Sequence, residues 1–256
     1  MTLWLSQILQ GMAIKYAVEH WRRSRPRGMG TLYWQLNDVW PGASWSSIDY
    51  HGRWKALHYM ARHFFAPVLV SGIEDLEKGF VEVHITSDLG EPVSGTLQWT
   101  VTNAAGQRLR HGAKRVRTPV QGNRKVAILR LGDLLARHGK RDLLVWLELE
   151  AKGQPASSNI VMFARPKHLE LANRPGISKR VTVRPDGSFL VTLTAKQSAL
   201  WAWLELAGRD GRCSDNFVHL RPGRPVEVTV KPKRDLPVAQ FRKRLRVRSL
   251  VDTCAS

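Results

Sequence analysis

The sequence is short of cysteine, with only Cys213 and Cys254 among 256 residues. Two cysteines make one disulfide at most, so a disulfide-stapled fold is excluded. They could pair with each other, but burial as a small free thiol is the more usual fate of such residues. The cysteine–histidine spacing typical of a zinc site is missing, and we predict neither a metal nor a cofactor.

Long apolar runs are also missing. None approaches the roughly 18 residues that a membrane-spanning helix requires. The longest early stretch is interrupted by Gln7, Gln10 and Lys15. No charged segment precedes it, as one would in a signal peptide. We therefore expect a soluble chain with no membrane partner, and its compartment stays open.

Acidic residues are scarce: 21 Asp and Glu stand against 40 Lys and Arg, which gives a formal net charge of +19. Such an excess is typical of proteins that bind nucleic acid or an acidic surface. The basic residues gather in three separate places, 22–27, 108–117 and 242–248. We favour the alternative interpretation, in which the basic residues are spread over solvated faces of the protein. No nucleic acid is expected as a partner unless the clusters converge on one face of the fold.

Familiar catalytic motifs are absent as well. The sequence has no Gly-x-Ser-x-Gly elbow, no phosphate loop and no His-Glu-x-x-His. His51, His58 and His63 do not fall on one helical face, because their spacings do not match the helical repeat. We predict no metal site from them.

The first 66 residues have the element order of the last unit of a parallel barrel. Residues 2–24 predict an amphipathic helix ended by Pro26, residues 30–36 suit a strand, and residues 53–65 predict a second helix. A whole (β/α)8 barrel needs about 250 residues, so only its terminal α/β unit fits here. The apolar face of the first helix would contain Leu5, Ile8, Leu9, Met12 and Tyr16, and its polar face Lys15, Glu19, Arg22 and Arg23.

From Pro67 the pattern changes to short strands separated by turn signals. Leu97, Trp99 and Val101 alternate with polar residues, which predicts a strand with one buried and one solvated face. The pattern is typical of an antiparallel β-sandwich. Strands are predicted at 80–86, 95–102, 125–131, 143–151 and 159–164, with a short helix at 131–138.

A linker around 173–176 opens a second β-rich block without sequence repeat of the first. Its strands are predicted at 178–183, 188–194, 200–207, 216–220, 226–230 and 241–247, where the last one partly alternates apolar with basic residues. The predicted fold is mainly β: a terminal barrel unit at 1–66 and antiparallel sandwiches at 67–172 and 173–256.

Residues 29–59 carry the most specific pattern: Gly-Thr-Leu-Tyr-Trp-Gln-Leu-Asn-Asp-Val-Trp-Pro, then Ser-Trp-Ser-Ser-Ile-Asp and Arg-Trp-Lys. This segment resembles the end of the catalytic barrel in β-mannosidases of glycoside hydrolase family 2. The Ala-Val-Glu-His-Trp-Arg-Arg stretch at 17–23 is similar to that family too. So are Ser-Asp-Asn at 214–216 and Leu-Arg-Pro-Gly at 220–223.

The resemblance implies two Ig-like sandwiches and a sugar site at the end of the barrel strand. Ligands meet parallel-barrel strands at their C-terminal ends, where Trp34, Asn37, Asp38 and Trp40 follow in this sequence. An indole suits the apolar face of a pyranose, and Asn or Asp can hydrogen-bond to hydroxyls. The resemblance implies that Trp34 forms part of the floor under a terminal mannose. Trp45 is a weaker candidate, and packing roles are expected for Trp4, Trp21 and Trp54.

The family hydrolyses terminal β-mannosides with retention, by means of two glutamates on earlier barrel strands that this sequence does not include. Within residues 1–66 the single glutamate is Glu19, which neighbouring basic residues can pair. Asp38 and Asp49 are disfavoured as a replacement pair, because both match loop positions of the family. We assign no catalytic residue. We expect hydrolysis of a β-mannoside or manno-oligosaccharide only together with an N-terminal, barrel-bearing partner fragment.

An alternative hypothesis is a non-catalytic β-sandwich module that binds carbohydrate or another partner. A sugar platform would need exposed aromatics, and Trp99, Trp201 and Trp203 are available. Trp201 and Trp203 share one face of a strand, but their apolar neighbours predict a core position. Residues 1–66 are also expected to expose an apolar face where other barrel strands belong, so that deleting them should improve solubility.

Overall fold

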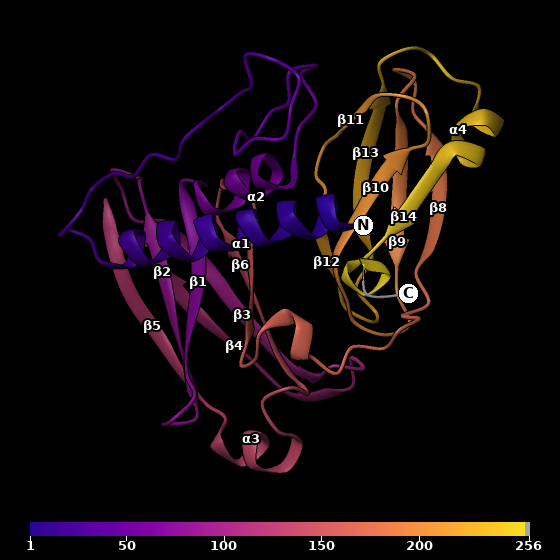
Figure 1. The fold of residues 1–256 in the computed structure, drawn as a ribbon. Helices are drawn as coiled ribbons and strands as arrows, with labels where there is room; N and C mark the ends of the chain where they lie inside the picture. Colours follow the sequence, from indigo (N-terminus) through magenta and orange to yellow (C-terminus); the bar gives the residue numbers. More distant parts are fainter. Residues whose placement is uncertain (254–256) are drawn as a thin grey trace. The chain divides into compact units, whose positions relative to one another are not determined.

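The computed structural model describes residues 1–253, so Cys254 lies outside the described residues. The chain forms two compact units (Figure 1). Unit 1 contains Met1–Ala13, Tyr33–Met60 and the chain from Leu171 onward, and unit 2 contains Ile14–Leu32 and Ala61–Glu170. The domain boundaries at 66 and 172 stay a prediction. In the described part, no helix combines the length and the apolarity needed to cross a membrane.

Helix α1 (Thr2–Arg23) confirms the first predicted helix, but its buried face differs from the predicted one. The apolar side chains of Leu5, Leu9 and Tyr16 are exposed, whereas the charged side chain of Glu19 is buried. Glu19 is buried because it has partners: the amide of Asn159 donates to its Oε1 at 2.7 Å, and Lys15 forms an ion pair with it at 3.0 Å. Hydrophobic spacing alone does not predict the burial of charged side chains that have such hydrogen-bond and ion-pair partners.

Arg22 of α1 is also buried, with 4% of its surface exposed. Its Nη1 donates to the carbonyl oxygens of Phe64 and Ala66, at 2.8 Å each, and its Nη2 donates to Asp88 Oδ2 at 3.1 Å. Phe64 is the last residue of helix α2 (Ala56–Phe64), whose terminal carbonyls lack partners within the helix. Arg22 therefore joins α1 to the C-terminal end of α2 inside unit 2.

The strand predicted at 30–36 is absent. Between α1 and α2 the structure has only two isolated bridges, a parallel one between Asn37 and Ile48 and an antiparallel one between Ile48 and Trp54. A strand forms when neighbouring strands accept and donate its backbone hydrogen bonds, and the described residues supply no such neighbours here. Both helices of the predicted barrel unit are present, whereas its strand is not.

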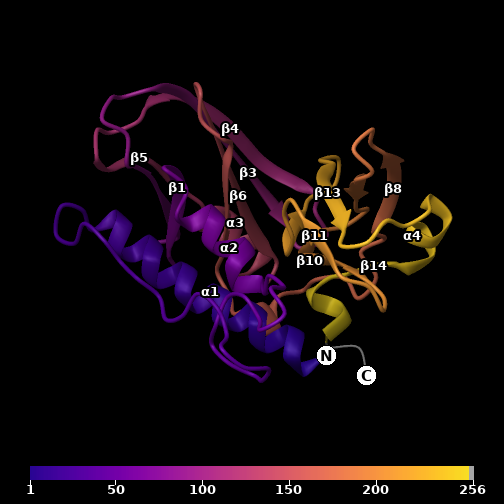
Figure 2. The ribbon, with the colours of Figure 1, turned by 90° about the horizontal axis from the view of Figure 1, so that it is seen from above.

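Unit 2 contains two antiparallel sheets, with strand orders β1-β2-β5 and β4-β3-β6-β7, and Figure 2 shows them as separate layers. The strands are β1 (Val68–Asp75), β2 (Phe80–Ser87), β3 (Ser94–Asn103), β4 (Arg108–Arg117), β5 (Gly122–Arg130), β6 (Leu143–Ala151) and β7 (Ser157–Met162). The predicted helix is present as α3 (Gly132–His138), and a 3-10 turn, η1 (Pro166–His168), follows β7. The sandwich prediction for this part of the chain is confirmed.

The core of unit 2 lies between its two sheets. On β3, Leu97 and Val101 are fully buried while Gln98 is exposed, as the alternation predicts. Trp99 packs over Gly112 of β4, where a Cβ would lie only 2.3 Å from the indole. Glycine is therefore required on the edge strand at that point. The buried cluster also includes Val68, Val70, Val81, Val83, Ile85, Leu143, Val145, Leu147 and Val161.

The second sandwich belongs to unit 1 and has sheets ordered β11-β13-β9-β8 and β12-β10-β14. Its elements are β8 (Ser178–Val183), β9 (Phe189–Thr194), β10 (Ala199–Leu206), β11 (Gly211–Cys213), β12 (Val218–Leu220), β13 (Val226–Pro232), α4 (Val238–Arg244), β14 (Leu245–Arg248) and η2 (Leu250–Thr253). The strand predicted at 241–247 is wrong in its first half, which is the end of α4. Phe241 is fully buried and stacks on Phe189 at 3.9 Å, so packing holds this segment as a helix.

Trp201 and Trp203 on β10 are core residues, with 3% and 0% of their surface exposed, as predicted. Trp4 of α1 stacks on Trp203 with ring centroids 5.2 Å apart, which confirms a packing role for Trp4. Trp21, for which packing was also predicted, is instead 46% exposed. Deleting residues 1–66 would remove Trp4 and uncover Trp203. The same deletion would remove exposed apolar side chains such as those of Leu9 and Trp34, so the expected gain in solubility stays a prediction.

Candidate functional site

The candidate sugar site lies on residues 33–50, called here the aromatic loop. Backbone hydrogen bonds fold this loop on itself: Ser47 N–H donates to Gln35 O at 3.0 Å, Ile48 N–H to Leu36 O at 2.8 Å, and Asp38 N–H to Ile48 O at 3.0 Å. The loop is thus defined by its own hydrogen bonds, although it has neither helix nor strand. The peptide bond between Trp34 and Gln35 is cis.

Ser47 is the buried centre of the aromatic loop. Its hydroxyl donates to Leu36 O at 2.9 Å and also lies 2.9 Å from the Tyr33 hydroxyl and 3.0 Å from His58 Nδ1. His58 comes from α2, so it anchors the loop to that helix. Among the described residues, no group of His, Cys, Asp and Glu is arranged to hold a metal.

Two glutamines of α1 form hydrogen bonds with the aromatic loop and with the start of α2. Gln10 Nε2 donates to Trp45 O at 2.6 Å. The side-chain oxygen of Gln7 accepts from the Ala56 N–H at 3.1 Å, and so satisfies a free donor at the start of α2. Neither role could be predicted from the sequence, because a glutamine inside a helix is ordinarily a solvated residue.

Asp38 is held within the loop by several donors. The Ser44 hydroxyl donates to its Oδ1, and Lys55 Nζ lies 3.1 Å from its Oδ2. Lys55 also donates to Ser46 at 2.7 Å. Hydrogen bonds from Ser44, Ser46 and Lys55 keep the pKa of Asp38 below its ordinary value. Oδ1 has a partner inside the loop and Oδ2 has one in Lys55, just before α2, an arrangement suited to holding the loop in shape.

Acid should loosen the aromatic loop through Asp38. Because the pKa of Asp38 is lower in the folded state, its ionised carboxylate stabilises the folded loop. This stabilisation is complete above the ordinary carboxyl pKa of about 4 and is lost as pH falls through the lower folded-state pKa. We expect amide-exchange protection factors across residues 36–48 to fall below about pH 4. Asp38→Asn should lower them already at pH 7. Equal protection in the variant and the parent at pH 7 would contradict this role.

The remaining predicted site residues are open to solvent. Trp34 is 76% exposed and Trp40 is 71% exposed. Within residues 1–253 neither indole has a hydrogen-bond or ring partner, whereas the exposed Trp45 donates from Nε1 to Gln35 Oε1 at 3.3 Å. Asn37 is exposed, and its amide donates to Asp38 O at 3.2 Å. The amide of Asn37 is thus held by the main chain of Asp38, and the indoles of Trp34 and Trp40 are left available.

The described residues of the loop and of α1 contain no pair of carboxylates free for catalysis. Asp49 Oδ1 accepts from the N–H groups of His51 and Arg53 at 2.9 and 2.8 Å. Glu19 is buried among its partners on α1, and Asp38 is held by Ser44 and Lys55. A retaining glycosidase needs a nucleophile and an acid/base about 5–5.5 Å apart, and these three carboxylates serve as structural hydrogen-bond acceptors.

Trp54 packs beside a cavity of about 670 Å3 in unit 1, whose lining also includes Tyr59 and Cys213. Its ring lies 4.3 Å from His58, and the Arg212 guanidinium lies 4.3 Å from its centroid. The packing role predicted for Trp54 is therefore confirmed. Burial of Cys213 raises its pKa to about 12, so this thiol is protonated and unreactive at neutral pH.

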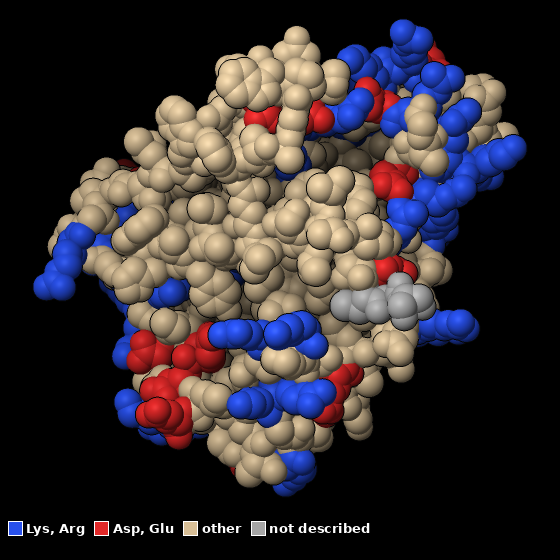
Figure 3. Space-filling model, viewed as in Figure 1, with Lys and Arg blue, Asp and Glu red and all other residues tan. Residues whose placement is uncertain are grey.

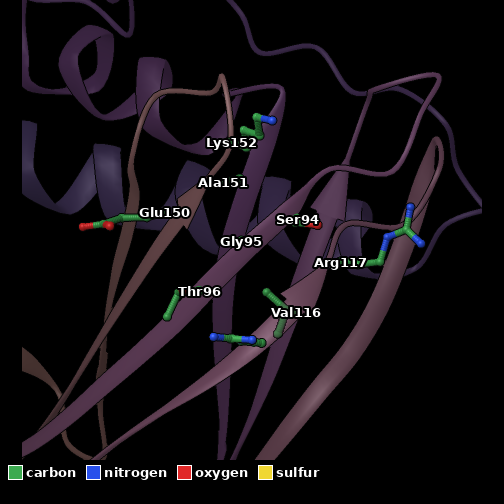
Figure 4. A pocket seen from close by; sticks show the side chains of 9 residues that line it. Ser94, Gly95, Thr96, Val116, Arg117, Glu150, Ala151 and Lys152 are labelled. Atoms are coloured by element: carbon green, nitrogen blue, oxygen red, sulfur yellow. The ribbon is translucent and has the colours of Figure 1, made fainter.

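A second hollow, of about 720 Å3, lies on unit 2 where β3 begins and β4 and β6 end (Figure 4). Arg115, Arg117, Glu150 and Lys152 line it, and Figure 4 shows no aromatic ring among its side chains. Neutral sugars bind best against aromatic faces. Trp201 and Trp203 are buried in the other sandwich. The alternative of a sandwich module with an aromatic sugar platform therefore gains no support.

Family models match both sandwiches. Residues 79–168 match the mannosidase Ig/CBM-like domain, and residues 172–253 match an Ig-fold domain of mannosidases. Together the two matched ranges leave out the first 78 residues, which include the aromatic loop.

Curated relatives extend the similarity across the whole chain. β-Mannosidase A of Neosartorya fischeri is 29% identical over 264 residues, which cover 96% of this chain and 28% of that protein. β-Mannosidase of Bos taurus is 49% identical over 96 residues, which cover 34% of this chain and 11% of that protein. The chain thus spans little more than a quarter of the length of the relatives that it matches from end to end.

Solved structures agree with these relatives. The β-D-mannosidase of Dictyoglomus thermophilum is similar with a TM-score of 0.82 and 27% identity, over 96% of this chain and 29% of that one. An exo-chitosanase of Amycolatopsis orientalis is similar with a TM-score of 0.65 and 17% identity, over 95% of this chain and 33% of that one. The second likeness shows a shared fold alone.

Proposed function

Because the chain is homologous to the C-terminal region of family 2 β-mannosidases and carries its Ig-like domains, we propose that it is the C-terminal part of an enzyme that hydrolyses terminal β-mannosides. In this proposal the aromatic loop completes the mannoside site once the rest of the barrel is in place. Trp34 supports the apolar face of the sugar, Asn37, Asp38 and Trp40 contact it, and Asp38 also keeps the loop in shape.

Exposed apolar side chains in the first 50 residues carry the proposal. Leu32 is 97% exposed and Trp34 is 76% exposed, which is costly for such large apolar groups in water. A barrel neighbour would cover them. The exposed apolar residues of this part are Met1, Leu3, Leu5, Leu9, Tyr16, Trp21, Met29, Leu32, Trp34, Leu36, Val39, Trp40, Trp45 and Tyr50.

The chemistry of the complete enzyme would be double displacement. One carboxylate attacks the anomeric carbon and displaces the aglycone, which the second carboxyl protonates, and water then releases mannose. This chain would supply neither carboxylate. Its contribution would be to hold the sugar in the orientation that the attack requires, which lowers the barrier by positioning.

Association with a barrel-bearing N-terminal β-mannosidase fragment tests this proposal. We expect a one-to-one complex in which acrylamide quenches tryptophan fluorescence less than in the free chain, because Trp34 and Trp40 become covered. Leu32→Glu should abolish the complex. Leu76→Glu, which changes another exposed leucine, should leave it intact. Equal binding by both variants would mean that a different surface is used, and the proposal would fail.

A further inference from the structure

The second sandwich carries a cluster of cations around α4, called here the α4 basic face and made of Lys179, Arg242, Lys243, Arg244 and Arg246. Figure 3 shows Lys and Arg side chains gathered over α4 and the β8 edge, at the upper right of the view. Within residues 1–253 none of these five side chains forms an ion pair with a carboxylate. The nearby Glu205 on β10 is paired instead with Arg248.

Main-chain carbonyls fix four of these cations in place. Lys179 Nζ donates to Leu245 O at 2.6 Å, and Arg242 Nη2 donates to Val181 O at 3.2 Å. In the same region, Arg246 Nη1 donates to Lys243 O at 2.8 Å and Arg244 Nη1 to Ala207 O at 3.0 Å. One bond to a carbonyl leaves most of the donors of an ammonium or guanidinium group unused.

These cations repel one another. The pKa of Lys179 is lowered by burial and by the charge of Arg246 close to it. Arg242, Lys243 and Arg244 lie in the last turn of α4, where the helix dipole offsets part of their charge. The remaining charge is unfavourable in the free protein, and an anion placed among these side chains would relieve the repulsion.

The residues around the α4 basic face indicate which kind of anionic partner it suits. From Leu171 to Thr253 the only large apolar residue with more than a third of its surface exposed is Val183, at 52%. Single-stranded nucleic acids and neutral sugars bind against exposed aromatic rings, and none is present here. With no exposed aromatic ring beside it, this face suits a partner that binds by charge, such as a flexible chain with repeated carboxylate groups.

We propose that the α4 basic face binds an acidic polysaccharide. Arg242, Lys243 and Arg246 form ion pairs with successive anionic groups of the chain, and Arg guanidinium groups can hold a carboxylate through two parallel hydrogen bonds. The choice of a glycan rests on the proposed function, because a β-mannosidase works among polysaccharides. Binding itself needs no barrel partner, so failed hydrolysis and failed binding are separate results.

Binding of the whole chain to polygalacturonate, measured by calorimetry at several salt concentrations, tests the proposal. The variant Arg242→Gln/Lys243→Gln/Arg246→Gln should bind at least tenfold more weakly, with a shallower salt dependence because fewer counterions are released. A matched control, Arg137→Gln/Lys140→Gln/Lys167→Gln, removes the same charge from exposed positions of unit 2. It should bind like the parent. Thermal melting of both variants checks that each is folded.

Three results would overturn the proposal. If the chain does not bind polygalacturonate, the proposal is wrong. Equal weakening by the two triple variants would attribute binding to the net charge of +19 alone. Tighter binding to a 20-base-pair DNA duplex than to polygalacturonate, with the same dependence on the α4 residues, would assign the face to nucleic acid. Dextran, a neutral chain, should not bind in any case.

Discussion

Replacing Trp34 with alanine is expected to lower kcat/KM for an aryl β-mannoside by about 30-fold or more in the enzyme completed by a barrel-bearing fragment. The loss corresponds to about 2 kcal/mol, the usual effect of removing a central aromatic contact from a desolvated site. The indole is 76% exposed in this chain, so the substitution should leave its folding unchanged. Steady-state hydrolysis of the aryl mannoside measures the effect.

Two companion variants separate sugar contact from a general loss of aromatic surface. Trp34→Phe keeps a flat ring and should retain a large part of the activity. Trp21→Ala removes an indole that is 46% exposed on α1, among the apolar residues that the fragment would cover but outside the aromatic loop, and should leave kcat/KM unchanged when the fragment is saturating. If Trp21→Ala and Trp34→Ala reduce kcat/KM equally, the indole of Trp34 has no special part in binding the sugar.

Replacing Arg22 with alanine is expected to destabilise unit 2 by about 3 kcal/mol, or roughly 10 °C in Tm. The substitution removes the donors that satisfy Phe64 O and Ala66 O and leaves Asp88 with one ion-pair partner fewer. Arg22→Lys should be intermediate, because an ammonium group cannot reach two carbonyls and a carboxylate in the same planar arrangement. Calorimetric melting measures the effect.

The control for this prediction is Arg27→Ala, since Arg27 is exposed and lies outside α1. Surface substitutions of this kind change stability by about 0.5 kcal/mol or less. If Arg22→Ala melts within about 2 °C of the parent, the hydrogen bonds of Arg22 do not join α1 to the end of α2 in solution.

Strands with one wet and one buried face could be predicted from their alternation, and the buried strands β6 and β10 from short apolar runs between turn signals. Leu97 and Val101 alternate with polar residues, and their strand lies where the alternation placed it. β1 and β4 were not predicted, and neither was the short strand β11. β1 is buried along most of its length and shows no alternation, and β4 has five basic residues on a sheet edge, where charge discourages unwanted pairing. Neither β1 nor β4 has the two-residue alternation of apolar and polar residues that indicates a strand in a sequence.

The candidate site could be predicted only in part. Trp34, Asn37, Asp38 and Trp40 were singled out by resemblance and by their position after an expected strand, and their contact with sugar stays a prediction. The expected strand at 30–36 is absent from the structure, which has only isolated bridges between α1 and α2. The partners of Asp38 could not be foreseen, because Ser44 and Lys55 reach it through the fold of the loop.

The face of α1 shows the same limit. Hydrophobic spacing placed Glu19 and Arg22 in solvent, yet both are buried because Asn159 and the carbonyls after α2 satisfy them. Such contacts join residues more than 40 positions apart. A helical repeat contains no information about them, whereas a structure displays them directly.

Hydrolysis of a chromogenic β-mannoside by the purified 256-residue chain tests the account most directly, when measured alone and after mixing with a barrel-bearing N-terminal fragment. We predict no hydrolysis by the chain alone and hydrolysis on mixing, with Leu32→Glu abolishing the gain. Hydrolysis by the isolated chain, lost on replacing Asp38 or Asp49, would contradict the account, because it would place the catalytic carboxylates within this chain.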